Sequence, residues 1–301
     1  MINELHTVGD FIRWGATQFN KSQIFFGHGT ENAIDESVVL VCHALHLPPD
    51  ISDILWHSRL TTIEKQAILD LFNQRIEQRI PTPYLTGEAW FAQMSFFVNK
   101  HVLIPRSPIA ELIEQQFQPW VEPNEVEHVL DLCTGSGCIA IACAMRAFPN
   151  AEIDAVDISL EALEVADKNI ENYGLEQRVQ TIKSDLFSNL AGKRYDLIIC
   201  NPPYVDPHEL ETMPDEYHHE PRLGLEAGED GLLLVKEILK KAPDYLTDEG
   251  KLIVEVGVSQ TQLVEQYPKV PFRWIEFQRG GLGVFLLTKE ECNYISNSKD
   301  V

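Results

Sequence analysis

From residue 129 onward, short apolar runs alternate with amphipathic segments, and this alternation most constrains the fold. The apolar runs are 129–132, 152–156, 179–182, 195–200, 251–256, 272–277 and 283–287. Helical periodicity fills 139–147, 160–173 and 232–245 between them. Strands that alternate with helices predict an α/β fold whose mostly parallel sheet is covered on both faces. The last two runs are joined by a short turn at Arg279-Gly280-Gly281, so we expect an antiparallel hairpin at the sheet edge.

Residues 1–80 have the pattern of a separate helical domain. Apolar residues recur at helical spacing in 8–20, 35–47 and 62–79, and no catalytic constellation occurs there. Residues 81–108 carry prolines and glycines around strand-like runs at 94–98 and 102–104, which predicts a hairpin linking two domains. The main domain then spans 109–290, and we expect the polar residues 291–301 to form a flexible tail.

Acidic residues greatly outnumber basic ones. With 24 Lys+Arg against 46 Asp+Glu, the formal net charge is −22. A field of this sign repels nucleic-acid phosphates and attracts basic partners. The chain begins without the pattern of a secretory signal, and no apolar run approaches the roughly 20 residues of a membrane helix. We therefore expect a cytoplasmic protein that binds neither membrane nor nucleic acid directly.

Metal binding is not indicated by the cysteine and histidine spacing. The six cysteines form no C-x-x-C pair. His43 and His46 share one predicted helix, and His218 and His219 share one loop, but neither pair has a third ligand close in the sequence. We expect buried thiols and no metal site.

Acidic residues stand where three successive predicted strands end. The first strand leads through Asp131 into a turn whose glycines, Gly135 and Gly137, let the backbone approach a ligand at a helix start. Asp157 ends the second strand, where a carboxylate suits two ribose hydroxyls, and Asp185 ends the third, within reach of an adenine amino group. Taken alone, the glycine turn also fits a nicotinamide enzyme.

The fourth strand runs directly into Asn201-Pro202-Pro203-Tyr204. An amide nitrogen is a poor nucleophile, so methyl transfer to it depends on acceptors that hold its N–H groups in line with the donor. The side-chain oxygen of Asn201 and the carbonyl of Pro202 are such acceptors, and proline offers no competing N–H. Tyr204 adds a ring that can stack on a planar acceptor group. The tetrapeptide therefore predicts group transfer to a planar nitrogen.

The acid-tipped strands and the Asn-Pro-Pro-Tyr element resemble the class I S-adenosylmethionine methyltransferases with a Rossmann-like seven-stranded sheet, in particular the protein glutamine methyltransferases of the HemK/PrmB type. The resemblance covers nearly the whole chain. It implies S-adenosyl-L-methionine as cofactor and a small N-terminal helical domain that recognises the substrate. The cofactor-binding residues are expected to be Asp131, Thr134, Gly135, Ser136, Gly137, Asp157, Asp185, Leu186 and Asn201. The catalytic residues are expected to be Asn201, Pro202, Pro203 and Tyr204.

Two stretches point to one branch of that family. The linker 103–113 and the glycine turn 131–138, with Cys133 in place of glycine, are similar to the branch that methylates a glutamine of large-subunit ribosomal protein L three. The release-factor branch has Pro-Arg-Pro and acidic residues in the linker, and methylation of release factors stays the alternative. An adenine methyltransferase would share the tetrapeptide but should carry a basic groove. The resemblance also places Gly228, Asp230, Gly231 and Leu232 near the active site.

The segment 205–231 directly follows the tetrapeptide and is strongly acidic. Its single basic residue is Arg222. Its nine acids are Asp206, Glu209, Glu211, Asp215, Glu216, Glu220, Glu226, Glu229 and Asp230. We expect this segment to rim the acceptor pocket and to dock a basic polypeptide, such as a ribosomal protein before ribosome assembly.

Overall fold

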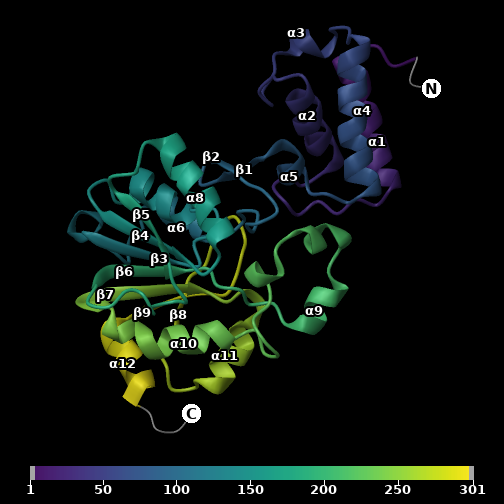
Figure 1. Ribbon diagram of the computed structural model, residues 1–301. Helices are drawn as coiled ribbons and strands as arrows, with labels where there is room; N and C mark the ends of the chain where they lie inside the picture. Colours follow the sequence, from purple (N-terminus) through teal and green to yellow (C-terminus); the bar gives the residue numbers. More distant parts are fainter. Residues whose placement is uncertain (1–3, 298–301) are drawn as a thin grey trace. The chain divides into compact units, whose positions relative to one another are not determined.

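The computed structural model describes residues 4–297 and consists of two compact units (Figure 1). The first unit contains the chain up to Ala89 together with Met213–His219. The second contains Trp90–Thr212 and the chain from Glu220 onward. A short piece of the acidic segment after the tetrapeptide therefore packs with the N-terminal helices, an arrangement that sequence periodicity gave no sign of.

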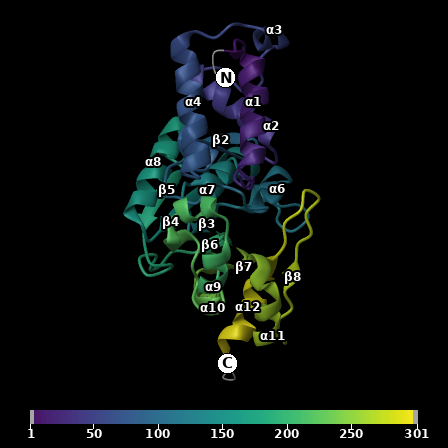
Figure 2. The same cartoon turned by 90° about the vertical axis from the view of Figure 1, so that its right-hand side faces the viewer.

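The first unit is helical, as its periodicity predicts. Its helices are α1 (Val8–Lys21), α2 (Ala33–Ala44), α3 (Asp53–Trp56), α4 (Thr62–Glu77) and α5 (Thr82–Thr86). The three long helices pack alongside one another (Figure 2) around a core that includes Phe11, Phe19 and Phe72. Capping boxes at Thr7 and Thr61 fix where α1 and α4 begin.

The second unit contains a seven-stranded sheet, and the predicted fold class is confirmed. Its strands are β3 (His128–Leu132), β4 (Glu152–Asp157), β5 (Val179–Lys183), β6 (Tyr195–Cys200), β7 (Leu246–Glu255), β8 (Arg273–Trp274) and β9 (Val284–Thr288). The order is β5-β4-β3-β6-β7-β9-β8. The first five are parallel neighbours, whereas β9 is antiparallel to both β7 and β8, so the C-terminal strands form the expected edge hairpin.

Helices cover both faces of this sheet (Figure 1). One face carries α6 (Ile109–Glu114), α7 (Cys138–Ala142) and α8 (Leu160–Tyr173) over a core that includes Phe117 and Phe148. The other carries α10 (Leu233–Lys241), α11 (Gln260–Gln266) and α12 (Lys289–Asn297) over a core that includes Ile238 and Phe285. Helix α9 (Pro207–Thr212) follows the tetrapeptide. Among the described residues, no helix is both long and apolar enough to cross a bilayer.

The strand order sets where a ligand binds. The chain moves outward from β3 to β4 and β5, then returns to place β6 on the other side of β3. In such sheets the crevice between the first strand and the returning strand opens at their carboxyl ends. Leu132 and Cys200 are register partners at this point, so the glycine turn and Asn201 begin side by side.

Three local details differ from the sequence predictions. The linker hairpin consists of β1 (Glu88–Phe91) and β2 (Met94–Phe97), whereas 102–104 is a loop because the N–H of Ile104 donates to the Glu220 carboxylate instead of to a strand. The helix predicted for 139–147 becomes a π-turn over Cys143–Ala147 after α7. Residues expected in a flexible tail form α12, whose Cys292 is buried; 298–301 lie outside the described residues.

Candidate active site

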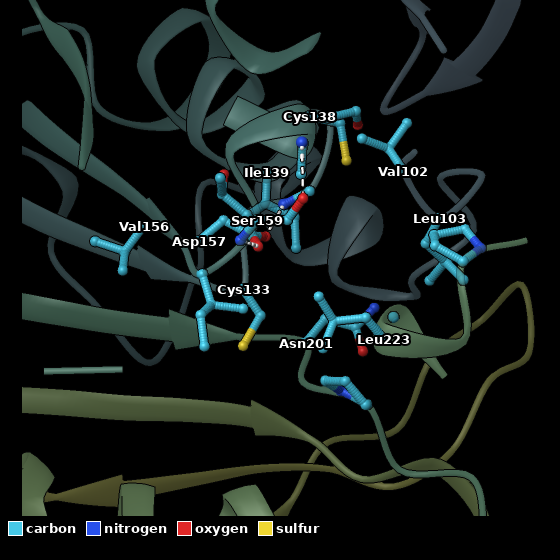
Figure 3. A pocket seen from close by; sticks show the side chains of 18 of the residues that line it. Val102, Leu103, Cys133, Cys138, Ile139, Val156, Asp157, Ser159, Asn201 and Leu223 are labelled. Carbon is cyan, nitrogen blue, oxygen red and sulfur yellow. Dashed lines mark hydrogen bonds between the residues drawn. The ribbon is translucent and has the colours of Figure 1, made fainter. Parts of the chain in front are cut away.

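A cavity lies at the carboxyl ends of β3, β4, β5 and β6 in the second unit. Figure 3 shows Asp157 and Ser159 on one side, Leu103 and Leu223 on the other, and Asn201 between Cys133 and Leu223. Leu103 belongs to the linker and Leu223 to the acidic segment. Both segments therefore form a wall opposite the strand ends. The strand-end residues were predicted to lie here, whereas the place of the linker in the cavity was not predicted.

The glycine turn is held by a buried carboxylate. Asp131 accepts hydrogen bonds from the Thr134 hydroxyl (2.5 Å) and the backbone N–H of Ala140 (3.1 Å). Burial raises the pKa of Asp131 to about 7 against these two donors. Thr134, Gly135 and Ser136 line the cavity, whereas Asp131 does not. Asp131 therefore stabilises the conformation of the turn without lining the cavity.

Gly137 also supports the turn without lining the cavity. It has φ +77°, and a Cβ there would lie 3.2 Å from the Cβ of Ala166 in α8. Only glycine combines this conformation with that close approach without strain. Its role is to bring α7 against α8, which aims the start of α7 at the cavity.

The Asp157 carboxylate is oriented by backbone donors in a way that suits two adjacent ligand hydroxyls. Its two carboxylate oxygens accept the backbone N–H groups of Gly135 and Ser159, each at 2.9 Å. Each oxygen retains a second lone pair for a ligand hydroxyl. Burial raises the pKa of Asp157 despite these donors. The next residue, Ile158, is 47% exposed on the cavity wall and offers an apolar surface to a flat base.

Asp185 and Leu186 line the far end of the cavity, beyond β5. The Asp185 side chain is exposed, and Leu186 has φ +46°, which turns the backbone at the strand end. This is the end that the sequence assigned to an adenine amino group. Cys133, the residue that marks the branch, also has positive φ (+59°), and its side chain lines the cavity (Figure 3).

Asn201 presents an unused acceptor. Its side-chain oxygen Oδ1 is buried and has no hydrogen-bond partner among the described residues. A buried acceptor without a donor costs free energy, so its retention beside a cavity indicates a ligand donor. Asn201 and Pro203 line the cavity; Pro202 is buried and does not.

Tyr204 is anchored on the side away from the cavity. Its hydroxyl donates to Oε1 of Glu255 at 2.9 Å, and its carbonyl accepts from the Ser259 hydroxyl at 3.2 Å. A Cβ on Gly257 would lie 2.6 Å from the tyrosine ring, so the ring rests on bare backbone. Gly231, from the loop expected near the site, packs as closely on the Tyr204 carbonyl. Sequence reasoning missed Glu255, although its place at the end of a buried strand was a signal.

The acidic segment is less available than its composition predicts. Five of its nine acids engage groups of this chain, as hydrogen-bond acceptors or ion-pair partners. They are Asp206, Glu216, Glu220, Glu226 and Asp230. Glu216 is buried and forms an ion pair with Arg75, with 2.9 Å between Oε1 and Nη1. Glu220 accepts hydrogen bonds from the Arg106 guanidinium and the backbone N–H of Ile104. Much of this negative charge therefore orders the segment itself.

The donor and acceptor set fits S-adenosyl-L-methionine. The cavity provides a carboxylate for a ribose, an apolar wall and an acid for an adenine, and a helix-start turn for the amino-acid end. The orphaned oxygen of Asn201 lies beyond this turn, where a methyl acceptor would enter.

Comparison with known proteins finds a matching family model, similar relatives and a structural neighbour. Residues 113–215 match the model of the methyltransferase small domain. The chain is 52% identical to a ribosomal protein uL3 glutamine methyltransferase of Francisella tularensis over 97% of this chain and 93% of that protein. It is 50% identical to the protein of the same name from Xylella fastidiosa, over 96% and 91%. A solved methyltransferase structure from Pyrococcus furiosus covers 64% of this chain and 88% of its own, with 18% identity and a TM-score of 0.47.

Proposed function

Because this chain belongs to the family of ribosomal protein uL3 glutamine methyltransferases, we propose that it transfers a methyl group from S-adenosyl-L-methionine to the side-chain amide nitrogen of a glutamine in uL3. This is the large-subunit protein indicated by the linker and Cys133. The observation that carries the proposal is the buried, unpaired Oδ1 of Asn201 at the cavity wall. A primary amide offers two N–H groups, which is the complement that this acceptor lacks.

The chain binds the cofactor mainly through groups already in place. The Asp157 carboxylate accepts the ribose hydroxyls, while Asp185 and Leu186 receive the adenine edge. The turn Thr134–Ser136 lines the place for the amino-acid end. The N–H groups of Thr134 and Gly135 already donate to Val156 and Asp157, so the turn would bind this end through its remaining backbone groups and the Ser136 hydroxyl. Bound in this way, the cofactor supplies a methyl group on a sulfonium centre.

The tetrapeptide positions the acceptor. Asn201 Oδ1, at the cavity wall, accepts one amide N–H group. The second is assigned to the carbonyl of the adjacent Pro202, whose side chain is buried outside the cavity lining, and the two acceptors together aim the nitrogen lone pair at the donor. Pro202 and Pro203 have fixed φ and no N–H, so no internal donor competes for these oxygens. A strong general base is unnecessary, because the methylated protonated amide is acidic enough to lose its proton to water. Catalysis here consists of positioning and electrostatics.

The substrate is a basic protein in this proposal. Ribosomal proteins bind RNA and carry positive charge, whereas this chain has a formal net charge of −22. Glu211 and Glu229 are exposed on the segment after the tetrapeptide and remain to attract such a partner. The same field repels rRNA, so the enzyme acts on uL3 before ribosome assembly, in the cytoplasm, and not on nucleic acid or membrane.

The N-terminal helical domain, 1–80, recognises the substrate in this account. Its unit exposes Ile34, Ile54 and Ile63, each more than half accessible, on α2, α3 and α4 respectively. Exposed large apolar side chains of this kind are available for a protein partner.

Labelled S-adenosylmethionine tests the assignment. The purified chain is incubated with free uL3, intact ribosomes or release factors, and the methylated residue is identified by mass spectrometry. We expect label on one glutamine of free uL3 and little on ribosomes. Equal labelling of ribosomes would overturn the order of events, and labelling of release factors alone would overturn the substrate.

A further inference from the structure

Glu255 joins two segments that are far apart in the sequence. It is the last residue of β7 and only 4% exposed. Its Oε1 accepts the Tyr204 hydroxyl at 2.9 Å, and its Oε2 accepts the Ser107 hydroxyl at 2.5 Å. One carboxylate therefore connects the catalytic tetrapeptide to the linker.

Ser107 is itself fixed. Its oxygen accepts the backbone N–H of Ile109 at 3.1 Å, at the start of α6. A serine hydroxyl has one hydrogen, and here that hydrogen is committed to Glu255. The neighbouring Arg106 donates to Glu220 and adds positive charge near Glu255. Burial raises the pKa of Glu255, whereas the two hydroxyl donors and Arg106 oppose that rise.

A carboxylate at this place is not explained by fold stability. The preceding residues of β7, Ile253 and Val254, are apolar and fully buried, and a leucine at 255 would continue that pattern. Burying a carboxylate is costly, and replacing buried ionic groups by apolar ones is often neutral or stabilising. The carboxylate is therefore explained by the two hydroxyl groups that it binds, those of Ser107 and Tyr204.

Tyr204 transmits this constraint to the acceptor groups. The Tyr204 ring packs against the backbone of Gly257, and its carbonyl accepts the Ser259 hydroxyl. The hydrogen bond from the Tyr204 hydroxyl to Glu255 then fixes the far end of the side chain. Tyr204 directly follows Pro202 and Pro203, whose φ angles are fixed. The backbone between Tyr204 and Asn201 therefore has little conformational freedom. Motion of the tyrosine would tilt the acceptors away from the amide.

We propose that Glu255, oriented by Ser107, is a positioning residue that holds Tyr204 so that Asn201 and Pro202 keep the acceptor amide in line for transfer. This inference rests on the proposed function, because it assumes an amide acceptor at Asn201. It also gives the linker a role: Ser107, which lines the cavity, contributes to methyl transfer through its hydrogen bond to Glu255.

A double-mutant cycle tests the proposal in the full-length enzyme with free uL3. We expect Glu255→Leu and Tyr204→Phe each to lower kcat by about tenfold or more, with the dissociation constant of S-adenosylmethionine changed less than about twofold. Combining them should cost less than about twofold beyond Tyr204→Phe alone, since the anchor is already lost. Glu255→Gln, whose side-chain oxygen can still accept from Tyr204, should retain activity within about threefold. Glu249→Leu makes the same change at an exposed position of β7 and serves as control.

A purely structural role would give a different result. In that case Glu255→Leu would lower kcat by the same factor in the Tyr204→Phe background as in the wild type, and that outcome overturns the proposal.

A second measurement needs no acceptor. In protein labelled with ¹³C at the tyrosine ζ carbon, the Tyr204 signal is assigned by its loss in Tyr204→Phe. We expect Glu255→Leu and Ser107→Ala to shift it and Glu249→Leu to leave it unchanged. An unshifted signal in Glu255→Leu overturns the anchor, whereas failure of the wild type to label uL3 overturns the proposed function instead.

Discussion

The two ends of the cavity are built in different ways. At the cofactor end, each functional group is positioned by residues close in the sequence or by the adjacent parallel strand; Asp157, for example, accepts from Ser159 and Gly135. At the acceptor end, Tyr204 depends on Glu255, and Glu255 on Ser107, across long stretches of chain. The cofactor end is a locally encoded binding site, whereas the acceptor end depends on tertiary structure for its alignment. Both ends keep buried oxygens without a partner among the described residues: Asp131 Oδ1 and Ser136 Oγ in the glycine turn, and Asn201 Oδ1 at the acceptor end.

The largest effect is expected at the acceptor end. Asn201→Ala removes the unpaired oxygen and should lower kcat by about 10²–10³ or more, because a preorganised transition-state contact is lost. The dissociation constant of S-adenosylmethionine, measured by calorimetry, should stay within about threefold of the wild type. Asn172→Ala changes an exposed asparagine in α8 and serves as control. Retained turnover by Asn201→Ala would contradict the assignment of Asn201 as an acceptor for the amide N–H.

The cofactor end should respond through affinity. Asp157→Ala removes the acceptor for the ribose hydroxyls and should weaken cofactor binding by about 100-fold, the equivalent of two charge-assisted hydrogen bonds. At saturating cofactor, kcat should recover to a large part of the wild-type value. Glu164→Ala, at an exposed position of α8, is the control. An unchanged dissociation constant would contradict the placement of the ribose.

Two glycines give a matched pair. Gly257→Ala forces a Cβ into the Tyr204 ring and should lower kcat by about tenfold while cofactor affinity is kept. Gly137→Ala strains the α7–α8 contact at φ +77° and should weaken cofactor binding by about tenfold with less effect on kcat. Steady-state kinetics and calorimetry on both variants separate the two ends. If both variants changed the same parameter, the distinction between the ends would fail.

The last prediction concerns the stability of the fold and its dependence on pH, and not catalysis. Burial raises the pKa of Asp131 from its ordinary value of 3.8 to about 7 in the folded protein, so between these values the folded state binds the extra proton. Stability from this group is present at low pH and is lost as pH rises toward about 7, by up to about 4 kcal/mol. Urea unfolding of wild type and Asp131→Asn from pH 5 to 8 should show a steeper decline in the wild type below pH 7. Parallel curves would contradict the raised pKa.

The same contrast explains what the sequence could predict. The strand-end acids and the glycine turn could be identified in the sequence because period, spacing and turn chemistry are local. The mostly parallel sheet followed from the alternation of strands and helices, and the antiparallel edge followed from the short turn at Arg279-Gly280-Gly281. The role of Tyr204 could be predicted only in part from the sequence. Its stacking surface is visible in the tetrapeptide, but its partner Glu255 is fixed by how β6 and β7 pair.

Charge composition was the least reliable guide to individual residues. The acidic segment 205–231 predicted a docking rim, yet Glu216 and Glu220 are buried against arginines of other segments. A count of acids cannot separate those that fold a loop from those that face a partner. That separation requires the positions of Arg75 and Arg106, which lie more than 100 residues away.

The most direct test of the central claim is mass spectrometry of uL3 and the release factors from cells with and without this gene. We expect one glutamine of uL3 to lack its methyl group when the gene is absent and to regain it with the wild type but not with Asn201→Ala. Persistence of the methyl group on uL3 in cells without the gene, or its loss from the release factors instead, would contradict the account.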